Sequence, residues 1–194
     1  MNFLSHLFLS GNSEGLILGN FIADSVKGSD YKNYSPEIRK GILLHRQIDT
    51  YTDSHPVVEQ SKVRLRPKYR KYASVIVDVY YDHYLAANWK DYSAEDLHDY
   101  ARRMYTLIQK NRDLLPPKSA QFAKYMVQYN ILEAYSHLEG IERVLKGMAQ
   151  RAKFVSNMEH SIEDLKEHYL LFENEFKLFF PDLQQFVNNQ IRIS

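Results

Sequence analysis

Four segments within the first ninety residues carry polar or ionisable side chains spaced four residues apart. The pairs are Asn2/His6, Asn20/Asp24, His45/Asp49 and Asp78/Asp82. In an α-helix, residues four apart project from the same face, so each pair would present two polar groups in one direction. The last three pairs interrupt strongly apolar segments. Because a carboxylate is rarely buried without a partner, their convergence would require arginine, hydrogen bonds or a bound cation.

The densest of these segments is residues 41–56, GILLHRQIDTYTDSHP. Read as a helix, it has three side chains on one face and two beside it: His45, Asp49 and Asp53, flanked by Arg46 and His55. Such a face serves either as a hydrogen-bonded surface array or as a site for a hard metal. Ligand sets that mix imidazole and carboxylate suit Mn, Fe, Mg or Zn better than a soft metal.

A second feature is a run of positive charge between Glu59 and Asp78, where no acidic residue occurs. The six cations are Lys62, Arg64, Arg66, Lys68, Arg70 and Lys71. The run is either a solubilising face or a docking surface for an acidic partner, whose approach it would accelerate and orient. Tyr69 and Tyr72 interleave with the run, which would also suit a nucleic-acid backbone.

Composition restricts the possible functions. With 25 Lys+Arg against 24 Asp+Glu, the net charge is too small for the electrostatic field of the whole molecule to attract nucleic acid or an anionic membrane. No nucleic-acid partner is therefore expected. The absence of cysteine excludes disulfides, thiolate nucleophiles and iron–sulfur clusters, and fits the cytoplasm. The apolar start MNFLSHLFLSGN is too short for a membrane span of about 20 residues, so we expect a soluble, unprocessed protein.

Helices must position these groups, because the apolar residues recur at helical spacing and no alternating strand pattern is present. Expected helices cover about residues 1–10, 14–28, 36–55, 69–89, 93–111, 118–130, 133–149, 159–179 and 182–191, and a further helix starts near residue 56. A linker is expected at 114–119. We expect Pro181 to break the last long helix. With 44% hydrophobic residues, the sequence predicts one compact all-α domain over residues 1–194, of about eight or nine helices.

Four segments carry a more specific signal: MNFLSHLFLS, LGNFIADSVKG, GILLHRQIDTYTDSHP and DHYLAANW, in this order. Together they closely resemble the acyl carrier protein phosphodiesterase family, and weaker similarity continues through IERVLKGMAQR and LFENEFKLFFPDL. That family is regarded as a divergent, all-α relative of the HD-domain metal-dependent phosphohydrolases. The resemblance implies an HD-domain-like hydrolase that favours manganese and cleaves 4′-phosphopantetheine from a serine of holo-acyl carrier protein.

The resemblance also implies roles for individual residues. Candidates for metal ligands, or for residues that hold the ligands in place, are His6, Asp24, His45, Asp49, Asp78 and Asp82. Arg46 could offset charge on the phosphoryl oxygens, and His83, Asp53 or His55 could orient water or protonate the leaving serine oxygen. The cations of residues 62–71 would then recognise the acidic carrier protein.

Two other interpretations fit the same residues. The chain could be a metal-dependent phosphohydrolase that acts on a nucleotide or another small phosphodiester. It could also be a non-catalytic helical binding module, in which the carboxylates form structural salt bridges with Arg46 and neighbouring lysines and no metal is bound.

Overall fold

Helix α2 (Glu14–Ile22) packs tightly across α3 (Pro36–Ser54). In the computed structural model, which describes residues 1–193, a Cβ atom at Gly19 would lie 2.1 Å from the carbonyl oxygen of Ile38. A Cβ atom at Gly41 would lie 2.3 Å from the carbonyl oxygen of Leu16. Only glycine permits backbones to approach this closely. The crossing therefore brings the polar residues of α2 against those of α3.

Helix α3 follows the signals in its sequence. Pro36 occupies the first helical position, where its fixed φ suits the helix and its missing N–H is not needed. The helix ends at Ser54 because His55 precedes Pro56 and adopts an extended conformation, with φ −75° and ψ 129°. Its apolar stripe, Ile38, Ile42 and Ile48 among others, is buried.

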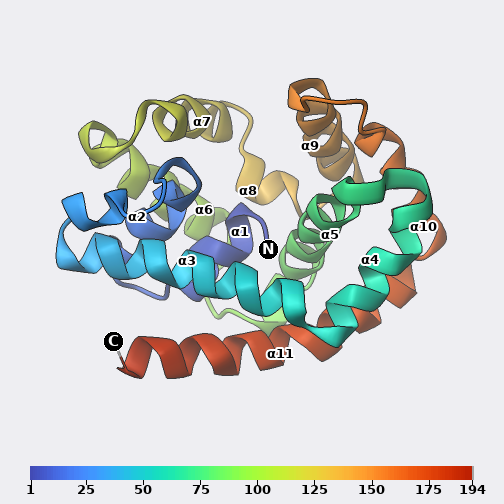
Figure 1. The fold of residues 1–194 in the computed structure, drawn as a ribbon, viewed down its shortest axis with the longest axis horizontal. Helices are drawn as coiled ribbons and strands as arrows, with labels where there is room; N and C mark the ends of the chain where they lie inside the picture. Colours follow the sequence, from blue (N-terminus) through green and yellow to red (C-terminus); the bar gives the residue numbers. More distant parts are fainter. Residues whose placement is uncertain (194) are drawn as a thin grey trace.

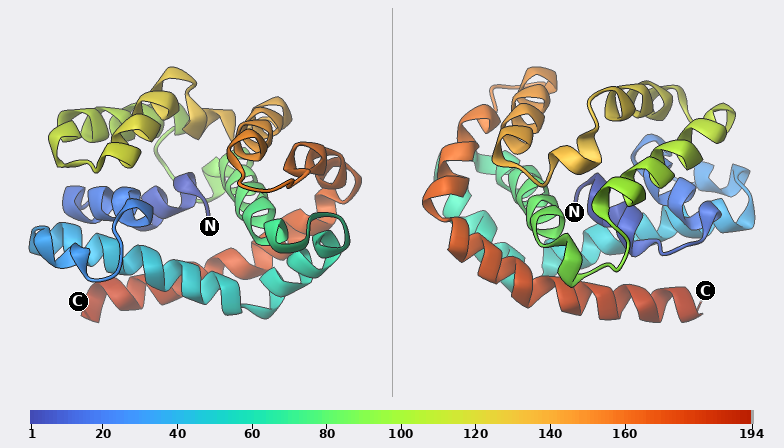
Figure 2. Two further views of the ribbon diagram at one scale, coloured as in Figure 1. Left: turned by 45° about the horizontal axis from the view of Figure 1, so that its top comes forward. Right: turned by 180° about the vertical axis from the view of Figure 1, so that it is seen from behind.

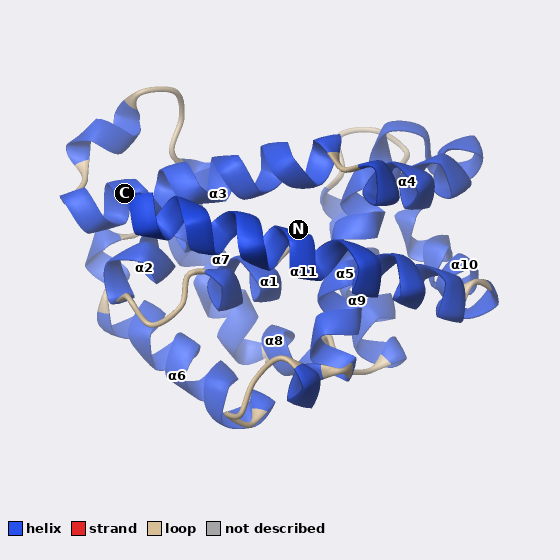
Figure 3. Cartoon of the chain, turned by 90° about the horizontal axis from the view of Figure 1, so that it is seen from below, coloured by secondary structure: helices blue, strands red, loops and turns tan. Residues whose placement is uncertain are grey.

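The other α-helices are α1 (Phe3–Leu9), α4 (Pro56–Tyr69), α5 (Ala73–Ala87), α6 (Leu97–Lys110), α7 (Pro117–Gln128), α8 (Ile131–Ala134), α9 (Leu138–Arg151), α10 (Ser161–Glu167) and α11 (Tyr169–Ile193). Short 3₁₀ turns, η1 to η6, join several of them. Within residues 1–193 every regular element is helical, which confirms the all-α prediction (Figure 3). None of the helices in this range is long and apolar enough to cross a membrane.

The core is organised around α5 and α11. Tyr80, Tyr81 and Tyr84 of α5 are fully buried against aromatic rings of α11, including Phe172 and Phe176. Their hydroxyl groups keep hydrogen-bond partners, as buried hydroxyls require. Helix α11 runs along one edge of the molecule beneath α3 and α5, and the amino-terminal end of α1 lies centrally, between α3 and α5 (Figures 1 and 2).

The prediction of a break at Pro181 is wrong. Helix α11 continues through Pro181 to Ile193. Proline removes one hydrogen bond, but the buried stripe continues on both sides, with Phe180 before it and Leu183 after it. The predicted helix 159–179 is instead divided at His168 between α10 and α11. With the short α8, this gives eleven α-helices in the described residues rather than eight or nine.

Candidate metal centre and its pocket

A pocket of about 540 Å³ opens beside the amino-terminal end of α1. One wall carries imidazoles and carboxylates: His6, Asp24, His45, Asp49, Asp53 and Asp78. The remaining polar side chains of the lining are three hydroxyls, two amides and two cations: Ser25, Ser74, Ser119, Asn2, Asn20, Lys118 and Arg151. The lining therefore combines groups that could bind a cation with groups that could bind an anion.

Three residues at this wall lie close enough to share one ion. A nitrogen of His6, a nitrogen of His45 and a carboxylate oxygen of Asp49 lie within 4.8 Å of one another. Asp49 places Oδ1 at 3.1 Å from His6 Nε2 and Oδ2 at 3.2 Å from His45 Nε2. The two imidazole rings stack with centroids 3.9 Å apart. Asp24 Oδ1 approaches His45 Nε2 at 3.3 Å and could add a further ligand.

Asn20 fixes the orientation of His45. The amide nitrogen of Asn20 donates to the His6 carbonyl oxygen at 3.0 Å and to Ser10 Oγ at 2.9 Å. Its Oδ1 atom therefore faces His45 Nδ1, at 2.9 Å, and that nitrogen must donate. In the neutral imidazole, the lone pair is then on Nε2 and points toward Asp24 and Asp49. A hydrogen bond of this kind is the usual support of a metal-binding histidine.

The electrostatics of the cluster favour a positive charge at its centre. Burial lowers the pKa of His45, but hydrogen bonds to Asp24 and Asp49 outweigh burial and raise it to about 9. Burial raises the pKa of Asp49, but hydrogen bonds from His45 and His6 hold it well below its usual range. Burial and the neighbouring His45 charge lower the pKa of His6 to about 4. In the metal-free protein a proton on His45 Nε2 supplies this positive charge. A divalent metal could replace that proton.

Asp78 lies at the edge of this cluster. Its Oδ1 atom accepts a hydrogen bond from the amino group of Met1 at 2.8 Å, and the same amino group lies 3.9 Å from Asp49 Oδ1. Burial raises the pKa of Asp78. Asp78 therefore lines the pocket but is not grouped with His6, His45 and Asp49.

Asp82 is not at the pocket surface. It is fully buried, and its carboxylate accepts from the backbone N–H groups of Leu4 at 2.7 Å, Ser5 at 3.2 Å and Asn2 at 3.3 Å, and from Ser5 Oγ. Free N–H groups at a helix start carry partial positive charge, which a carboxylate satisfies. Asp82 therefore anchors α1, the helix that carries His6.

This arrangement predicts a stability effect for Asp82→Ala. The substitution leaves buried N–H groups of α1 unsatisfied, so the free energy of unfolding should fall by about 3 kcal/mol. Urea unfolding followed by circular dichroism measures this change. The comparison is Asp99→Ala, because Asp99 is exposed and forms no ion pair within residues 1–193; it lies in the first turn of α6, so stability should change by less than about 1 kcal/mol. Equal stability of the two variants would contradict the anchoring role.

Three predicted catalytic residues lie outside the pocket lining. His83 Nδ1 lies 2.7 Å from the Tyr135 carbonyl oxygen, and Nε2 lies 2.9 Å from the Tyr169 hydroxyl. His55 Nδ1 accepts from the backbone N–H of Val57 at the start of α4. Arg46 donates to the carbonyl oxygens of Val26 and Gly28, at 2.9 and 3.0 Å, and so holds the segment after α2. The structure does not bring these three side chains to the cluster.

Most of the basic run is engaged in ion pairs. Four of its cations have carboxylate partners: Lys62 with Asp53 at 2.6 Å, Arg64 with Glu175 at 2.8 Å, Arg66 with Glu59, and Lys68 with Asp164 at 2.7 Å. The pair with Lys62 also fixes Asp53, which lines the pocket. Arg70 and Lys71 are exposed and have no carboxylate partner among the described residues. Most of the run therefore supports α4 rather than forming a free cationic surface.

Sequence reasoning missed the two cations of the pocket. Lys118 is the second residue of α7, after Pro116 and Pro117, which are typical of a linker, and Arg151 is the last residue of α9. Neither has a carboxylate partner in residues 1–193, although Arg151 lies over the ring of Tyr125. The two residues are far apart in sequence and meet only through the packing of the helices, so no local spacing could have indicated them.

The all-α fold thus gathers two imidazoles and a carboxylate in one pocket, a donor set that fits a divalent metal. The model of the family described as acyl carrier protein phosphodiesterase matches residues 1–183. The chain belongs to this family, which confirms the resemblance seen in the sequence.

Similar proteins cover nearly the whole chain. An acyl carrier protein phosphodiesterase of Yersinia enterocolitica is 35% identical over 182 residues, which are 93% of this chain and 94% of the relative. Proteins of the same name from an Enterobacter species and from Photorhabdus laumondii are each 33% identical over 191 residues, covering 98% of this chain and 99% and 96% of the relatives. No solved structure matches the chain.

Proposed function

We propose that this protein is a metal-dependent phosphodiesterase that releases 4′-phosphopantetheine from holo-acyl carrier protein and leaves the apo-protein. The family and the names of its members support the reaction and the substrate. The observation that carries the proposal is the cluster of His6, His45 and Asp49 in a pocket that also presents two cations, neither of which has a carboxylate partner in residues 1–193. This substrate would place the enzyme in fatty acid and lipid metabolism, in the cytoplasm, which suits a chain without cysteine.

In this proposal His6, His45 and Asp49 hold the metal, with Asp24 as a fourth ligand and Asn20 as the group that orients His45. Mn²⁺ is our first choice because the resemblance favours it, and Mg²⁺, Fe²⁺ or Zn²⁺ would also suit the donor set. Such a metal, when bound, lowers the pKa of water and offsets phosphoryl charge. A relationship to the HD-domain phosphohydrolases remains part of the proposal.

The other pocket residues have complementary roles. Lys118 and Arg151 lie at the pocket and form no ion pair with a carboxylate in the described part of the chain, so their charges could neutralise the phosphodiester oxygens. Asp53, which Lys62 holds at 2.6 Å, lines the same pocket and would serve as its proton acceptor. Ser25 and Ser119, which are hydrogen-bonded at 2.7 Å, close the side of the pocket near α7.

The substrate can be tested by comparing phosphodiesters. We expect the Mn²⁺-loaded protein to convert holo-acyl carrier protein to the apo-protein. We expect much slower turnover of bis(p-nitrophenyl) phosphate and of cyclic nucleotides. Faster turnover of a small phosphodiester than of the carrier protein would instead support the second enzyme interpretation. Binding of carrier protein without any turnover would support the non-catalytic one.

The pKa of His45 predicts how metal affinity depends on pH. Below a pKa of about 9, His45 is protonated in the metal-free protein, so a metal must displace one proton. Affinity for Mn²⁺ or Zn²⁺ should therefore rise about tenfold per pH unit between pH 6 and 8, and level off near pH 9. Competition titration with a chromophoric chelator measures the affinity. An affinity that does not change over this range would show that His45 is not a ligand.

A further inference from the structure

A surface patch beside the pocket combines basic and apolar side chains. It is formed by the turn η3 (Arg70–Tyr72) and by the segment that follows α9. We call it the docking patch and define it as Arg70, Lys71, Tyr72, Lys153, Phe154 and Val155. Phe154 is 57% exposed and Val155 is 88% exposed, so two adjacent apolar side chains lie in solvent. Exposed apolar groups rimmed by charge are typical of protein interaction sites.

Contacts between the two segments make the patch one surface. The Tyr72 hydroxyl donates to the Phe154 carbonyl oxygen at 3.2 Å. The Lys71 ammonium group lies 4.3 Å from the centroid of the Phe154 ring, and the Lys153 ammonium group lies 5.5 Å from it. One exposed aromatic ring is therefore flanked by two positive charges. Such cation–π contacts orient the lysines without neutralising them.

The cations of the patch differ from the rest of the basic run. No ion pair to a carboxylate is formed by Arg70, Lys71 or Lys153 within residues 1–193, whereas Lys62 to Lys68 supply four pairs. Arg70 also has φ 51° and ψ −125°, in a region that favours glycine. Glycine would adopt this backbone conformation with less strain than arginine. The conformation of the turn therefore gives no reason for an arginine at position 70.

The position of the patch connects it to the pocket. Ser74 and Val75, which follow η3, line the pocket. Arg151, which precedes the second segment of the patch, lines it too. Both segments of the docking patch thus adjoin the pocket rim. A partner bound there would hold a flexible attached group at the entrance to the candidate metal centre.

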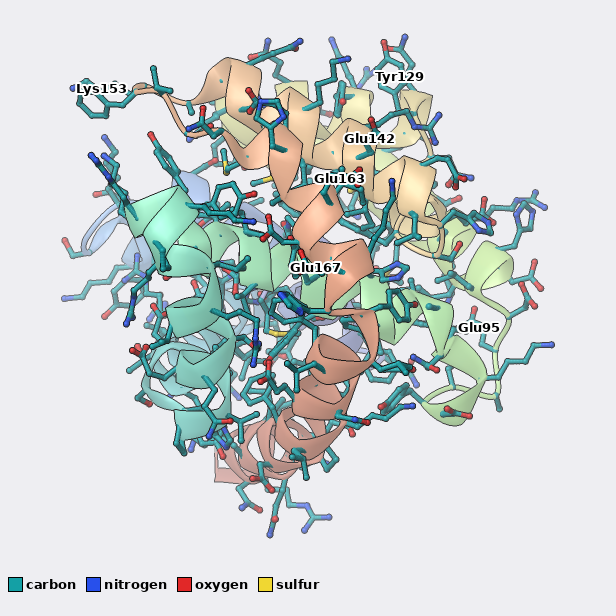
Figure 4. The ribbon with its side chains drawn as sticks, turned by 90° about the vertical axis from the view of Figure 1, so that its right-hand side faces the viewer. Glu95, Tyr129, Glu142, Lys153, Glu163 and Glu167 are labelled. Carbon is teal, nitrogen blue, oxygen red and sulfur yellow. The ribbon has the colours of Figure 1, made fainter. Side chains whose placement is uncertain are left out.

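The neighbouring face carries mixed charge, because Lys166 pairs with Glu163 at 3.0 Å and α9 holds Arg143 and Lys146 as well as Glu142. Lys153 lies at one edge of the molecule, and Glu142, Glu163 and Glu167 lie on the adjoining face of α9 and α10 (Figure 4). The docking patch instead presents three cations that form no ion pair within residues 1–193, so it would attract an acidic partner more strongly than this mixed face. The charge distribution therefore favours one docking position for an acidic protein.

We propose that the docking patch binds the carrier protein through an acidic surface of that protein that also presents an apolar side chain. The carboxylates would pair with Arg70, Lys71 and Lys153, and the apolar side chain would cover Phe154 and Val155. The serine-linked arm would then enter the pocket past Ser74 and Arg151. This inference rests on the proposed function for the identity of the partner, and it shares only Arg70 and Lys71 with the docking residues expected from the sequence.

The test uses a charge reversal on the intact, metal-loaded protein. Lys71→Glu combined with Lys153→Glu should raise KM for holo-acyl carrier protein about tenfold or more and leave kcat within about twofold, because the reacting groups are untouched. The matched control is Lys90→Glu combined with Arg102→Glu, two exposed cations that do not line the pocket. The control should keep the wild-type KM. Equal melting temperatures exclude misfolding as the cause.

Two outcomes separate this inference from the proposed function. If wild-type protein hydrolyses the carrier protein but the Lys71/Lys153 variant has an unchanged KM, the docking patch is wrong and the reaction stands. If wild-type protein does not hydrolyse it, the proposed function fails, and binding of apo-acyl carrier protein is measured by calorimetry. If wild-type protein binds apo-acyl carrier protein and the Lys71/Lys153 variant does not, the result supports binding at the docking patch. No binding by the wild type, or equal binding by both, overturns it.

Discussion

Asp49→Asn is expected to remove the bound metal and to lower kcat/KM on holo-acyl carrier protein by about a thousandfold or more. Asp49 is the centre of the cluster, because its two carboxylate oxygens face His6 Nε2 at 3.1 Å and His45 Nε2 at 3.2 Å. An amide has the same shape but no negative charge, and its NH₂ end cannot act as a ligand. Metal analysis and steady-state kinetics on the same preparation measure both effects.

The matched control for this prediction is Glu37→Gln, the same chemical change on the same helix. Glu37 is exposed at the start of α3, and its carboxylate lies 3.8 Å from Lys40. A surface pair of this kind contributes little, so metal content and activity should stay at the wild-type level. An Asp49→Asn protein that kept its metal and more than a tenth of its activity would contradict the site.

The second large effect is expected from Gly19→Ala, which should lower the free energy of unfolding by more than about 3 kcal/mol. The added Cβ atom would lie 2.1 Å from the Ile38 carbonyl oxygen and 2.8 Å from the Gly41 Cα atom. Both are backbone atoms, so α2 and α3 would have to separate. The hydrogen bond between Asn20 and His45 would then lengthen, and metal affinity would fall as well.

Gly147→Ala is the comparison for this experiment. It also replaces a glycine within a helix, but its Cβ atom would meet nothing closer than the Tyr125 hydroxyl, at 3.4 Å, and the end of the Arg151 side chain. Because alanine favours the helix, stability should stay the same or rise by about 0.5–1 kcal/mol. Urea unfolding of both variants gives the difference. A Gly19→Ala protein as stable as wild type would show that the α2–α3 contact is not tight.

The sequence predicted the helical faces that converge at the pocket. Spacing of four residues placed His45 with Asp49 and Asn20 with Asp24, and the structure brings these residues together with His6. The spacing could not distinguish their roles. Asn20 orients His45 from the side, and Asp82 faces the backbone of α1 rather than the pocket. These differences depend on the direction of a side chain after packing, which periodicity does not encode.

Other features depended on contacts between distant segments. Lys118 and Arg151 approach the pocket from α7 and α9 without any motif. The cations of the basic run were visible, but their partners, such as Glu175 for Arg64 and Asp164 for Lys68, come from the last third of the chain. Pro181 was expected to end a helix, yet the buried aromatic stripe of α11 carries the helix past it. In each case tertiary packing overrode a sound local expectation.

The most direct test of the central claim is intact mass spectrometry of holo-acyl carrier protein after incubation with the wild-type protein. Parallel reactions contain Mn²⁺, Mn²⁺ with an excess of chelator, or Mn²⁺ with the Asp49→Asn variant. We expect the carrier protein to lose its phosphopantetheine group only with wild-type protein and free Mn²⁺. Loss of the group in the presence of chelator, or with Asp49→Asn at the wild-type rate, would contradict a metal-dependent reaction at this site.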